Sequence, residues 1–87
     1  MRYKVYIEVI AHFNTEGKIT PQSIIWKGRL LEVDQILDVR RAASLKAGGL
    51  GIRYNIRIGN HTTFMWLDEN RWFVESKEDV GMDDYAK

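Results

Sequence analysis

The stretch Ile52-Arg53-Tyr54-Asn55-Ile56-Arg57-Ile58 indicates the fold class of this 87-residue chain. Apolar and polar side chains alternate along it, so that four large apolar groups face one way and three polar groups face the other. This period of two is typical of a β-strand with one buried face. Gly59-Asn60 is a turn pair, and residues 62–67 can return as the second strand of a hairpin. The sequence therefore predicts antiparallel β-structure in this region.

Alternation of the same kind runs through residues 2–13. Odd-numbered side chains face one way and even-numbered ones, Tyr6 among them, face the other, as in a half-buried strand. Residues 14–18 follow as a polar turn in which Gly17 can take a positive φ. A hairpin is therefore predicted at this end of the chain, and Pro21 suits the start of its return strand rather than the middle.

Shorter apolar runs complete the pattern. They predict strands at residues 23–27, 29–33, 34–39 and 72–74. Residues 40–47 stay open between strand, helix and loop, with an irregular or short helical segment favoured because part of this stretch has good helix propensity. Gly48-Gly49-Leu50-Gly51 then interrupts the chain before the central strand.

The fold class follows from this succession of short strands and turns. We expect an all-β domain, a small antiparallel barrel or SH3-like roll of five to six strands, with one short helical turn left open. The chain length admits one domain, whose bounds we predict at residues 2–75. Residues 76–87 are rich in Asp and Glu and poor in apolar side chains, so they are predicted to be an acidic, mobile tail.

Composition excludes several classes of protein. Hydrophobic residues make up 45% of the chain and charged residues 29%, which argues against disorder. There is no cysteine for a disulfide, a thiol nucleophile or a zinc ribbon. No stretch has the pattern of a secretory signal or a transmembrane helix. We therefore expect a cytoplasmic protein that does not associate with a membrane, and its oligomeric state stays open.

Charge is nearly balanced over the whole chain but uneven along it. The formal net charge is +1, from 13 basic and 12 acidic side chains. Residues 1–26, 27–71 and 72–87 carry net charges of +1, +3 and −3. A mildly basic body with an acidic end can bind a polyanion weakly, or be screened from one by its own tail.

The sequence lacks the usual patterns of catalysis and metal binding. His12 and His61 lie far apart without metal-ligand spacing, and no further group converges on Asp34 and Asp38. The glycines of residues 48–51 fit neither pattern of a phosphate-binding loop, and a flexible hairpin loop is the simpler interpretation. We therefore expect no enzyme activity, no catalytic or metal site and no cofactor.

Basic residues near the central strand suggest a face that binds nucleic acid. In small barrels, cations follow the phosphate backbone of a single strand while aromatic rings stack on its bases. The candidate cations are Arg40, Arg41, Lys46, Arg53 and Arg57, with Arg71 able to join them, and the candidate rings are Tyr6, Trp26, Trp66 and Trp72. The favoured function is a non-enzymatic binding module whose partner is DNA, RNA or a nucleic-acid enzyme.

A protein-interaction module is the alternative function. An open edge strand, or an aromatic groove formed by rings such as Trp26 and Trp72, can accept an extended or proline-rich peptide. In this alternative the partner is a protein, and the basic residues belong to ordinary solvated surface.

Four motifs carry a resemblance to known sequences. They are Ser23-Ile24-Ile25-Trp26-Lys27-Gly28-Arg29, the run from Val33 to Ala43, Gly51-Ile52-Arg53-Tyr54, and Arg71-Trp72-Phe73-Val74-Glu75. Over residues 5–75 the chain resembles short uncharacterised proteins of Gram-positive bacteria, particularly clostridia. More distantly, it is similar to a small β-domain family encoded beside error-prone DNA polymerases in some actinobacteria. The resemblance implies a small β domain connected with DNA metabolism, and the acidic tail lies outside it.

Overall fold

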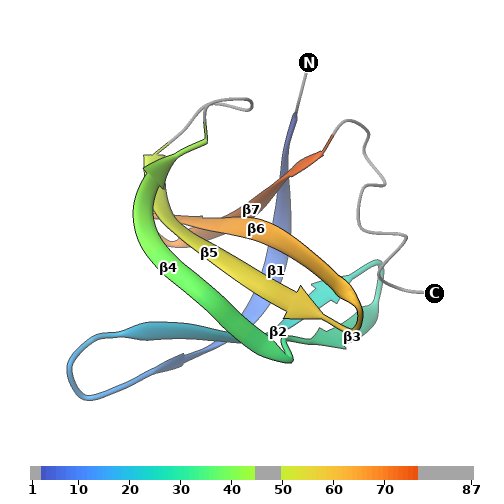
Figure 1. Ribbon diagram of the computed structural model, residues 1–87, viewed down its shortest axis with the longest axis horizontal. Helices are drawn as coiled ribbons and strands as arrows, with labels where there is room; N and C mark the ends of the chain where they lie inside the picture. The colour runs from blue at the N-terminus through green and yellow to red at the C-terminus, as the bar shows by residue number, and fades with distance from the viewer. Residues whose placement is uncertain (1–2, 45–49, 77–87) are drawn as a thin grey trace.

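A computed structural model describes residues 3–44 and 50–76, whose regular secondary structure is all β-strand. The strands are β1 (Tyr3–Phe13), β2 (Ile19–Trp26), β3 (Arg29–Glu32), β4 (Gln35–Ala43), β5 (Leu50–Ile58), β6 (His61–Asp68) and β7 (Arg71–Ser76). They form one antiparallel sheet of order β3-β2-β1-β7-β6-β5-β4 (Figure 1). The predicted all-β class is confirmed. The predicted number of five to six strands was wrong, because these residues form seven.

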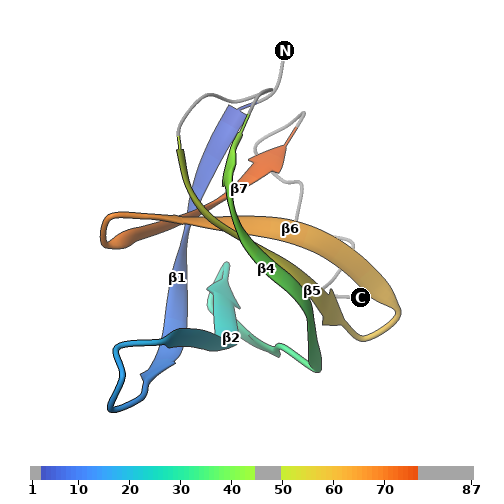
Figure 2. The same cartoon turned by 60° about the vertical axis from the view of Figure 1, so that its left-hand side comes forward.

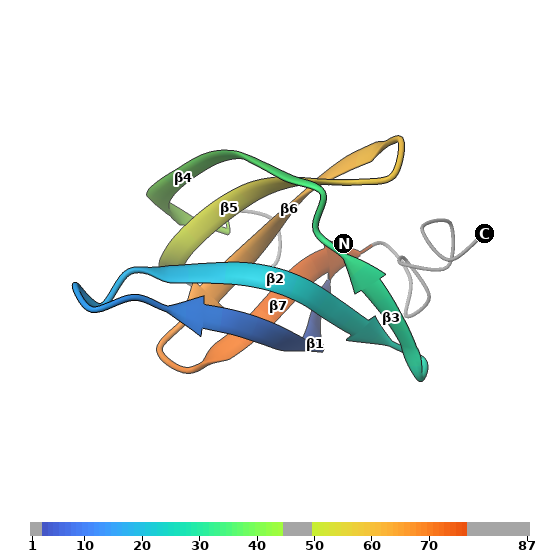
Figure 3. The same cartoon turned by 90° about the horizontal axis from the view of Figure 1, so that it is seen from below.

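The sheet curls because β1 has a different partner along each half of its length. Residues 3–7 pair with β7, and residues 8–13 pair with β2. The strand therefore passes from one layer of the molecule into the other. Figures 2 and 3 show the result, with the β1–β2 hairpin reaching out on one side and β4, β5 and β6 arching across from it. The sheet has the shape of a half-barrel.

The two edges of the sheet meet at one corner, where β3 leads directly into β4. The Val33 amide donates to the Gln22 carbonyl at 2.9 Å, and the next amide, Asp34, donates to the Arg57 carbonyl at 2.9 Å. Consecutive residues thus bond to β2 and to β5. From this corner the edges diverge, and the half-barrel stays open on that side.

One face of the curled sheet encloses the main hydrophobic core. Tyr54, Ile56 and Ile58 are buried there, which confirms the inward face predicted for the central strand. The other fully enclosed members come from β2, β6 and β7, and are Ile24, Trp26, Met65, Leu67, Trp72 and Val74. Since this small sheet has no helix to cover it within the described residues, its own curl must bury these side chains.

Turns occur where the sequence offers residues that accept a positive φ. Gly17, Gly28 and Gly59 have φ of 82°, 77° and 59° in the turns after β1, β2 and β5. In the first turn, the Asn14 side-chain oxygen accepts hydrogen bonds from the amides of Glu16 and Lys18 at 2.9 and 2.8 Å. The predicted turn at residues 14–18 is confirmed.

The predicted start of the second strand was wrong, because β2 begins at Ile19 and includes Pro21. Pro21 lies opposite Ala11, next to a register shift that leaves Gln22 without a partner on β1. A β-bulge tolerates proline since the ladder is interrupted there and one amide donor is not required.

The segment after Val39 is also different from the favoured interpretation. β4 continues as a regular strand to Ala43, paired with β5, so the described part of residues 40–47 is strand and not helix. Pairing with a long neighbour outweighs the local helix propensity of the alanines. Residues 45–49, which include Lys46, lie outside the described residues, as does the predicted tail apart from Ser76. None of the described residues forms a helix of the length and apolarity needed to cross a membrane.

Gly51 provides a test of how closely β5 and β6 pack. A Cβ atom at this position would lie 2.3 Å from the Leu67 carbonyl oxygen, a backbone atom that cannot move aside. Gly51→Ala should lower the free energy of unfolding by about 2–3 kcal/mol, measured by urea denaturation. Gly28→Ala is the control, because nothing lies within 4 Å of the position that the new Cβ would take. There only the positive φ lowers the free energy of unfolding, by about 1 kcal/mol. Equal losses in the two variants would contradict this packing.

Tyr54 links the two sides of the half-barrel. Its hydroxyl donates to the Ile19 carbonyl at 2.6 Å, and burial raises the pKa of the Tyr54 phenol above its ordinary 10.0. The stability that the protonated phenol contributes is therefore complete below pH 10.0 and is lost as the pH rises through the raised folded-state pKa. In urea denaturation, Tyr54→Phe should cost about 1 kcal/mol at neutral pH and progressively less above pH 10.0. Tyr6→Phe, at an exposed ring, should cost little at neutral pH; a pH-independent cost for Tyr54→Phe would refute the argument.

Candidate functional site

A second aromatic cluster lies on the sheet face opposite the core. Tyr6, Phe73, Trp66 and Arg53 form a row across β1, β7, β6 and β5, because each is the register partner of the next. Phe64 on β6 lies beside this row. We call this surface the outer face. It spans three strand spacings, about 14 Å at 4.7–4.9 Å per step.

The rings of the outer face are in direct contact. Trp66 stacks on Phe73 with ring centroids 5.4 Å apart and planes 6° from parallel. Tyr6 meets Phe73 edge to face at 6.0 Å, and Phe64 meets Trp66 at 6.2 Å. Trp66 and Phe73 are 3% and 0% exposed, whereas Tyr6 and Phe64 are 44% and 41% exposed. The inner pair is therefore structural, and the outer pair presents ring surface to solvent.

The end of β4 helps to enclose this cluster. Ser44 is 1% exposed, and its hydroxyl donates to Glu75 Oε2 on β7 at 2.9 Å. The bond joins strands that are separated in the sheet order by β5 and β6, so the sheet must curl over its outer face at this end. A hydrogen bond between a buried hydroxyl and a carboxylate is stronger than one between neutral groups.

Three cations lie over the rings of the outer face. The Arg71 Cζ atom is 3.5 Å from the Tyr6 ring centroid, the Arg53 Cζ atom 4.4 Å from that of Phe64, and the Lys4 Nζ atom 5.0 Å from that of Phe73. Within residues 3–44 and 50–76, none of the three forms an ion pair with a carboxylate. In this part of the chain each cation lies on a ring face, which is a weaker partner than a bonded anion. The Arg53 charge also helps to lower the pKa of the nearby Asp38 carboxyl.

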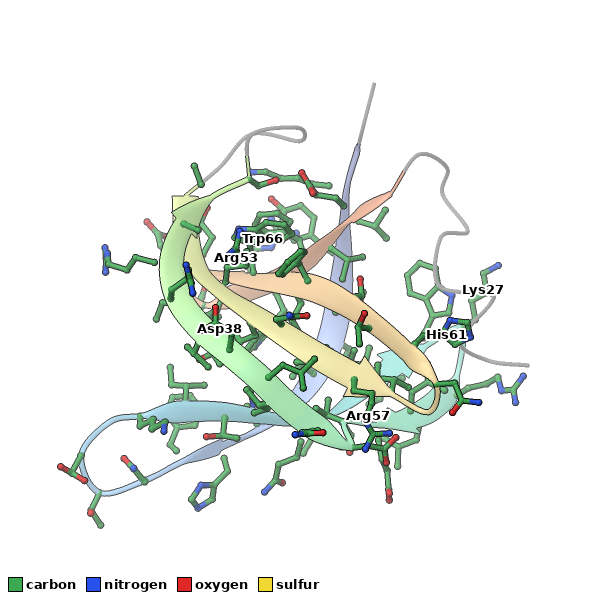
Figure 4. The ribbon with its side chains drawn as sticks, viewed as in Figure 1. Lys27, Asp38, Arg53, Arg57, His61 and Trp66 are labelled. Atoms are coloured by element: carbon green, nitrogen blue, oxygen red, sulfur yellow. The ribbon has the colours of Figure 1, made fainter. Side chains whose placement is uncertain are left out.

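Two buried donors of the outer face have no acceptor among the described residues. Neither Arg53 Nε nor Trp66 Nε1 has a hydrogen-bond partner in that part of the chain, although both atoms are shielded from solvent. They belong to register partners on adjacent strands, and Figure 4 shows the two side chains close together within the curl of β4 and β5. Buried donors are paired in most folded proteins. This end of the row therefore has unused capacity to donate to an acceptor.

Three of the predicted cations lie on the same side of the sheet, because Arg40 is the register partner of Arg53 and Arg57 lies four residues further along β5. Arg40 binds Asp38 at 2.7 Å, which lowers the pKa of the Asp38 carboxyl and raises the pKa of the Arg40 guanidinium. Arg57 donates to the Gly59 carbonyl at 2.7 Å and lies 3.9 Å from Asp34. These two arginines already have carboxylate partners.

The remaining predicted cations differ in position. Arg41 pairs with Ile52, whose side chain packs against the core, so Arg41 lies on the opposite side of β4 from Arg40. Lys46 lies outside the described residues. Arg53 alone among the five candidates joins the outer face without an ion pair.

The predicted rings are mostly buried. Trp26 and Trp72 are 8% and 9% exposed within the main core. The ring centroids of Trp72 and Tyr54 are 5.1 Å apart. Trp66 is buried in the outer cluster, and Tyr6 is the one candidate ring that is largely exposed. Lys4, Phe64 and Phe73 were missed. Alternation already assigned Lys4 and Tyr6 to one face of the first strand, but the neighbours of that face depended on the strand order.

Comparisons of the chain with protein families, with curated proteins and with solved structures found no match. In the part of the chain that the structure describes, no three metal-ligating side chains come together. Residues 3–44 and 50–76 together define a small all-β half-barrel whose outer face carries two partly exposed rings and three cations that lie on rings.

The bond between Ser44 and Glu75 should contribute measurably to stability. Ser44→Ala removes the donor and leaves a partly buried carboxylate without it, so the free energy of unfolding should fall by about 1–2 kcal/mol in urea denaturation. A double-mutant cycle with Glu75→Ala should give a coupling of about 1 kcal/mol. If the two losses of free energy are additive in the cycle, the hydrogen bond between the two side chains does not stabilise the fold.

Proposed function

We propose that the protein is a non-enzymatic module that binds single-stranded nucleic acid on its outer face. The observation that carries the proposal is the set of three cations, Lys4, Arg53 and Arg71, which lie on aromatic rings and form no ion pair within residues 3–44 and 50–76. Exchange of a ring for a phosphate is favourable for each cation, because a full negative charge attracts it more strongly than a ring quadrupole.

Release of the cations also uncovers the rings on which they lie. Tyr6 and Phe64 are already partly exposed, and either ring can then stack on a base. Stacking does not depend on base identity, since every base has an aromatic face. The proposed binding is therefore tolerant of sequence and limited to unpaired bases.

Arg53 is the central cation in this proposal. Its guanidinium lies on Phe64, and its Nε is an unpaired donor beside the Trp66 Nε1. Phosphate oxygens accept several hydrogen bonds at once, which suits a guanidinium with unused donors. The ion-paired Arg40 and Arg57 are secondary, because each must first leave a carboxylate.

Other features agree with this function. The resemblance to a domain family encoded beside error-prone DNA polymerases points toward DNA metabolism, in the cytoplasm. The net charge of +1 adds no general attraction to polyanions, so affinity must come from the outer face itself. The alternative of an aromatic peptide groove receives less support, because Trp26 and Trp72 are packed in the core.

Fluorescence anisotropy with a labelled oligothymidine tests the proposal. If three phosphates are neutralised, the logarithm of the affinity should fall with the logarithm of salt concentration with a slope of about −2, which is about a fifteenfold loss between 50 and 200 mM. The Arg53→Glu/Arg71→Glu double variant should reduce the affinity more than about tenfold, and Tyr6→Ala should reduce it about fivefold or more through lost stacking.

Arg29→Glu/Lys27→Glu is the matched control. It reverses the same amount of charge at exposed positions of the β2–β3 hairpin, away from the outer face, and should change the affinity less than the outer-face variant does. Equal losses in both variants would mean that only overall charge matters. No binding by the unaltered protein at low salt would refute the proposal.

A further inference from the structure

A groove between β4 and the first half of β2 remains unfilled in the half-barrel. We call this groove the wedge; it lies on the open side of the half-barrel, beyond the corner where Val33 and Asp34 bond to β2 and β5. Figure 3 shows the strands β2 and β4 that border this side. Its lining is Lys18, Ile19, Thr20, Ile36, Leu37, Asp38, Val39 and Tyr54. Asp38 lies on the side of β4 that continues the outer face, because its register partner Asn55 shares a side of β5 with Arg53. Ile36 and Val39 lie on the core-facing side, so the wedge opens toward the core side of β4.

Unpaired strand edges border the wedge on both sides. β4 is the last strand of the sheet and pairs with β5 alone among the described strands. On the other side, β3 pairs with β2 only from Ser23 onward, while the Gln22 carbonyl accepts the Val33 amide. The edge of β2 before Gln22 is therefore without a strand partner in the described residues. Backbone groups along such edges favour the addition of an extended chain.

Apolar side chains form part of the wedge lining. Leu37 and Val39 are 43% and 42% exposed, although Val39 is the register partner of the buried Tyr54 and so lies on the core-facing side of β4. Core-facing side chains are normally covered, and here the open half-barrel leaves them uncovered. Ile19 and Ile36 are partly buried beside them. An added strand that places apolar side chains on this side would continue the core.

The wide end of the wedge is basic. Lys18 belongs to its lining, and Arg41 follows Val39 on the same side of β4. The nearest carboxylate of the lining, Asp38, is already bound to Arg40 at 2.7 Å. Because β4 runs toward this end, a strand that pairs with it in the antiparallel sense begins here. An acidic residue at the start of that strand would meet Lys18 and Arg41.

We infer that the wedge binds an extended segment of a partner protein, which adds to β4 as an antiparallel strand. The segment carries apolar residues at alternate positions and acidic residues at its N-terminal end. The unpaired edges require an extended backbone, Leu37 and Val39 select the alternate apolar residues, and the basic end fixes the direction. The inference is independent of the nucleic-acid function, since it uses a different surface.

An NMR titration of the isotope-labelled full chain tests this inference. The probe is a capped peptide that starts with two aspartates and continues with alternating valine and threonine, at concentrations up to about 1 mM. Amide shifts and slowed hydrogen exchange are expected along β4. Val39→Lys should weaken binding about tenfold or more, because it places a charge on the apolar lining. Leu30→Lys, at an exposed leucine on the other edge strand, is the control and should leave the affinity unchanged.

Further arms separate strand addition from other modes of binding. The same peptide with all its backbone nitrogens methylated should not bind, because it cannot donate to β4; retained binding would overturn strand addition. A peptide with lysines in place of the aspartates should bind about fivefold more weakly or worse. Loss of β4 protection in the unaltered protein on dilution without peptide would assign the edge to a second copy of the chain instead. No shift along β4 at the highest peptide concentration would overturn the inference.

Discussion

The fold depends on one strand that has two partners in succession. β1 is bonded to β7 along residues 3–7 and to β2 along residues 8–13, so it belongs to both layers of the curled sheet. Each layer alone would leave its apolar face exposed to water. Because β1 joins them, the two layers bury Ile24, Ile56 and Val74 between them. The corner at Val33 and Asp34 keeps the layers together on the other side.

The same curl gives the protein two chemically different surfaces. The outer face presents cations on rings, and the wedge presents unpaired backbone edges beside apolar side chains. Consecutive residues of β5 serve the two surfaces, since Arg53 points to the outer face and Tyr54 to the wedge. Strand geometry makes this separation, because neighbouring side chains in a strand lie on opposite sides of the sheet.

Local patterns were sufficient to predict the β-strands and the inward face of the central strand. The alternation from Ile52 to Ile58 depends only on residues two positions apart, so tertiary context is not needed. The outer face was harder to predict, because Tyr6 and Phe73 are neighbours through the pairing of strands near opposite ends of the described chain. One signal was available: residues 64–67 and 72–74 are continuous apolar runs, as expected of strands buried on both faces. Arg40 and Arg57 form ion pairs with Asp38 and Asp34, whose positions depend on a register shift in β4 and on the corner before it.

The pairing of β1 with β7 has a consequence for how the chain folds. The strands β4 to β7 are not bonded to β1 until β1 meets β7, so the critical contacts join residues that are far apart in sequence. Contacts of this kind require closure of a long loop before they contribute stability, and they slow folding relative to a helical domain of similar length. During synthesis, residues 3–7 of β1 and the adjoining edge of β6 stay unpaired until residues 71–76 leave the ribosome. This topology therefore requires that those edges be protected from pairing with other chains while the protein is being made.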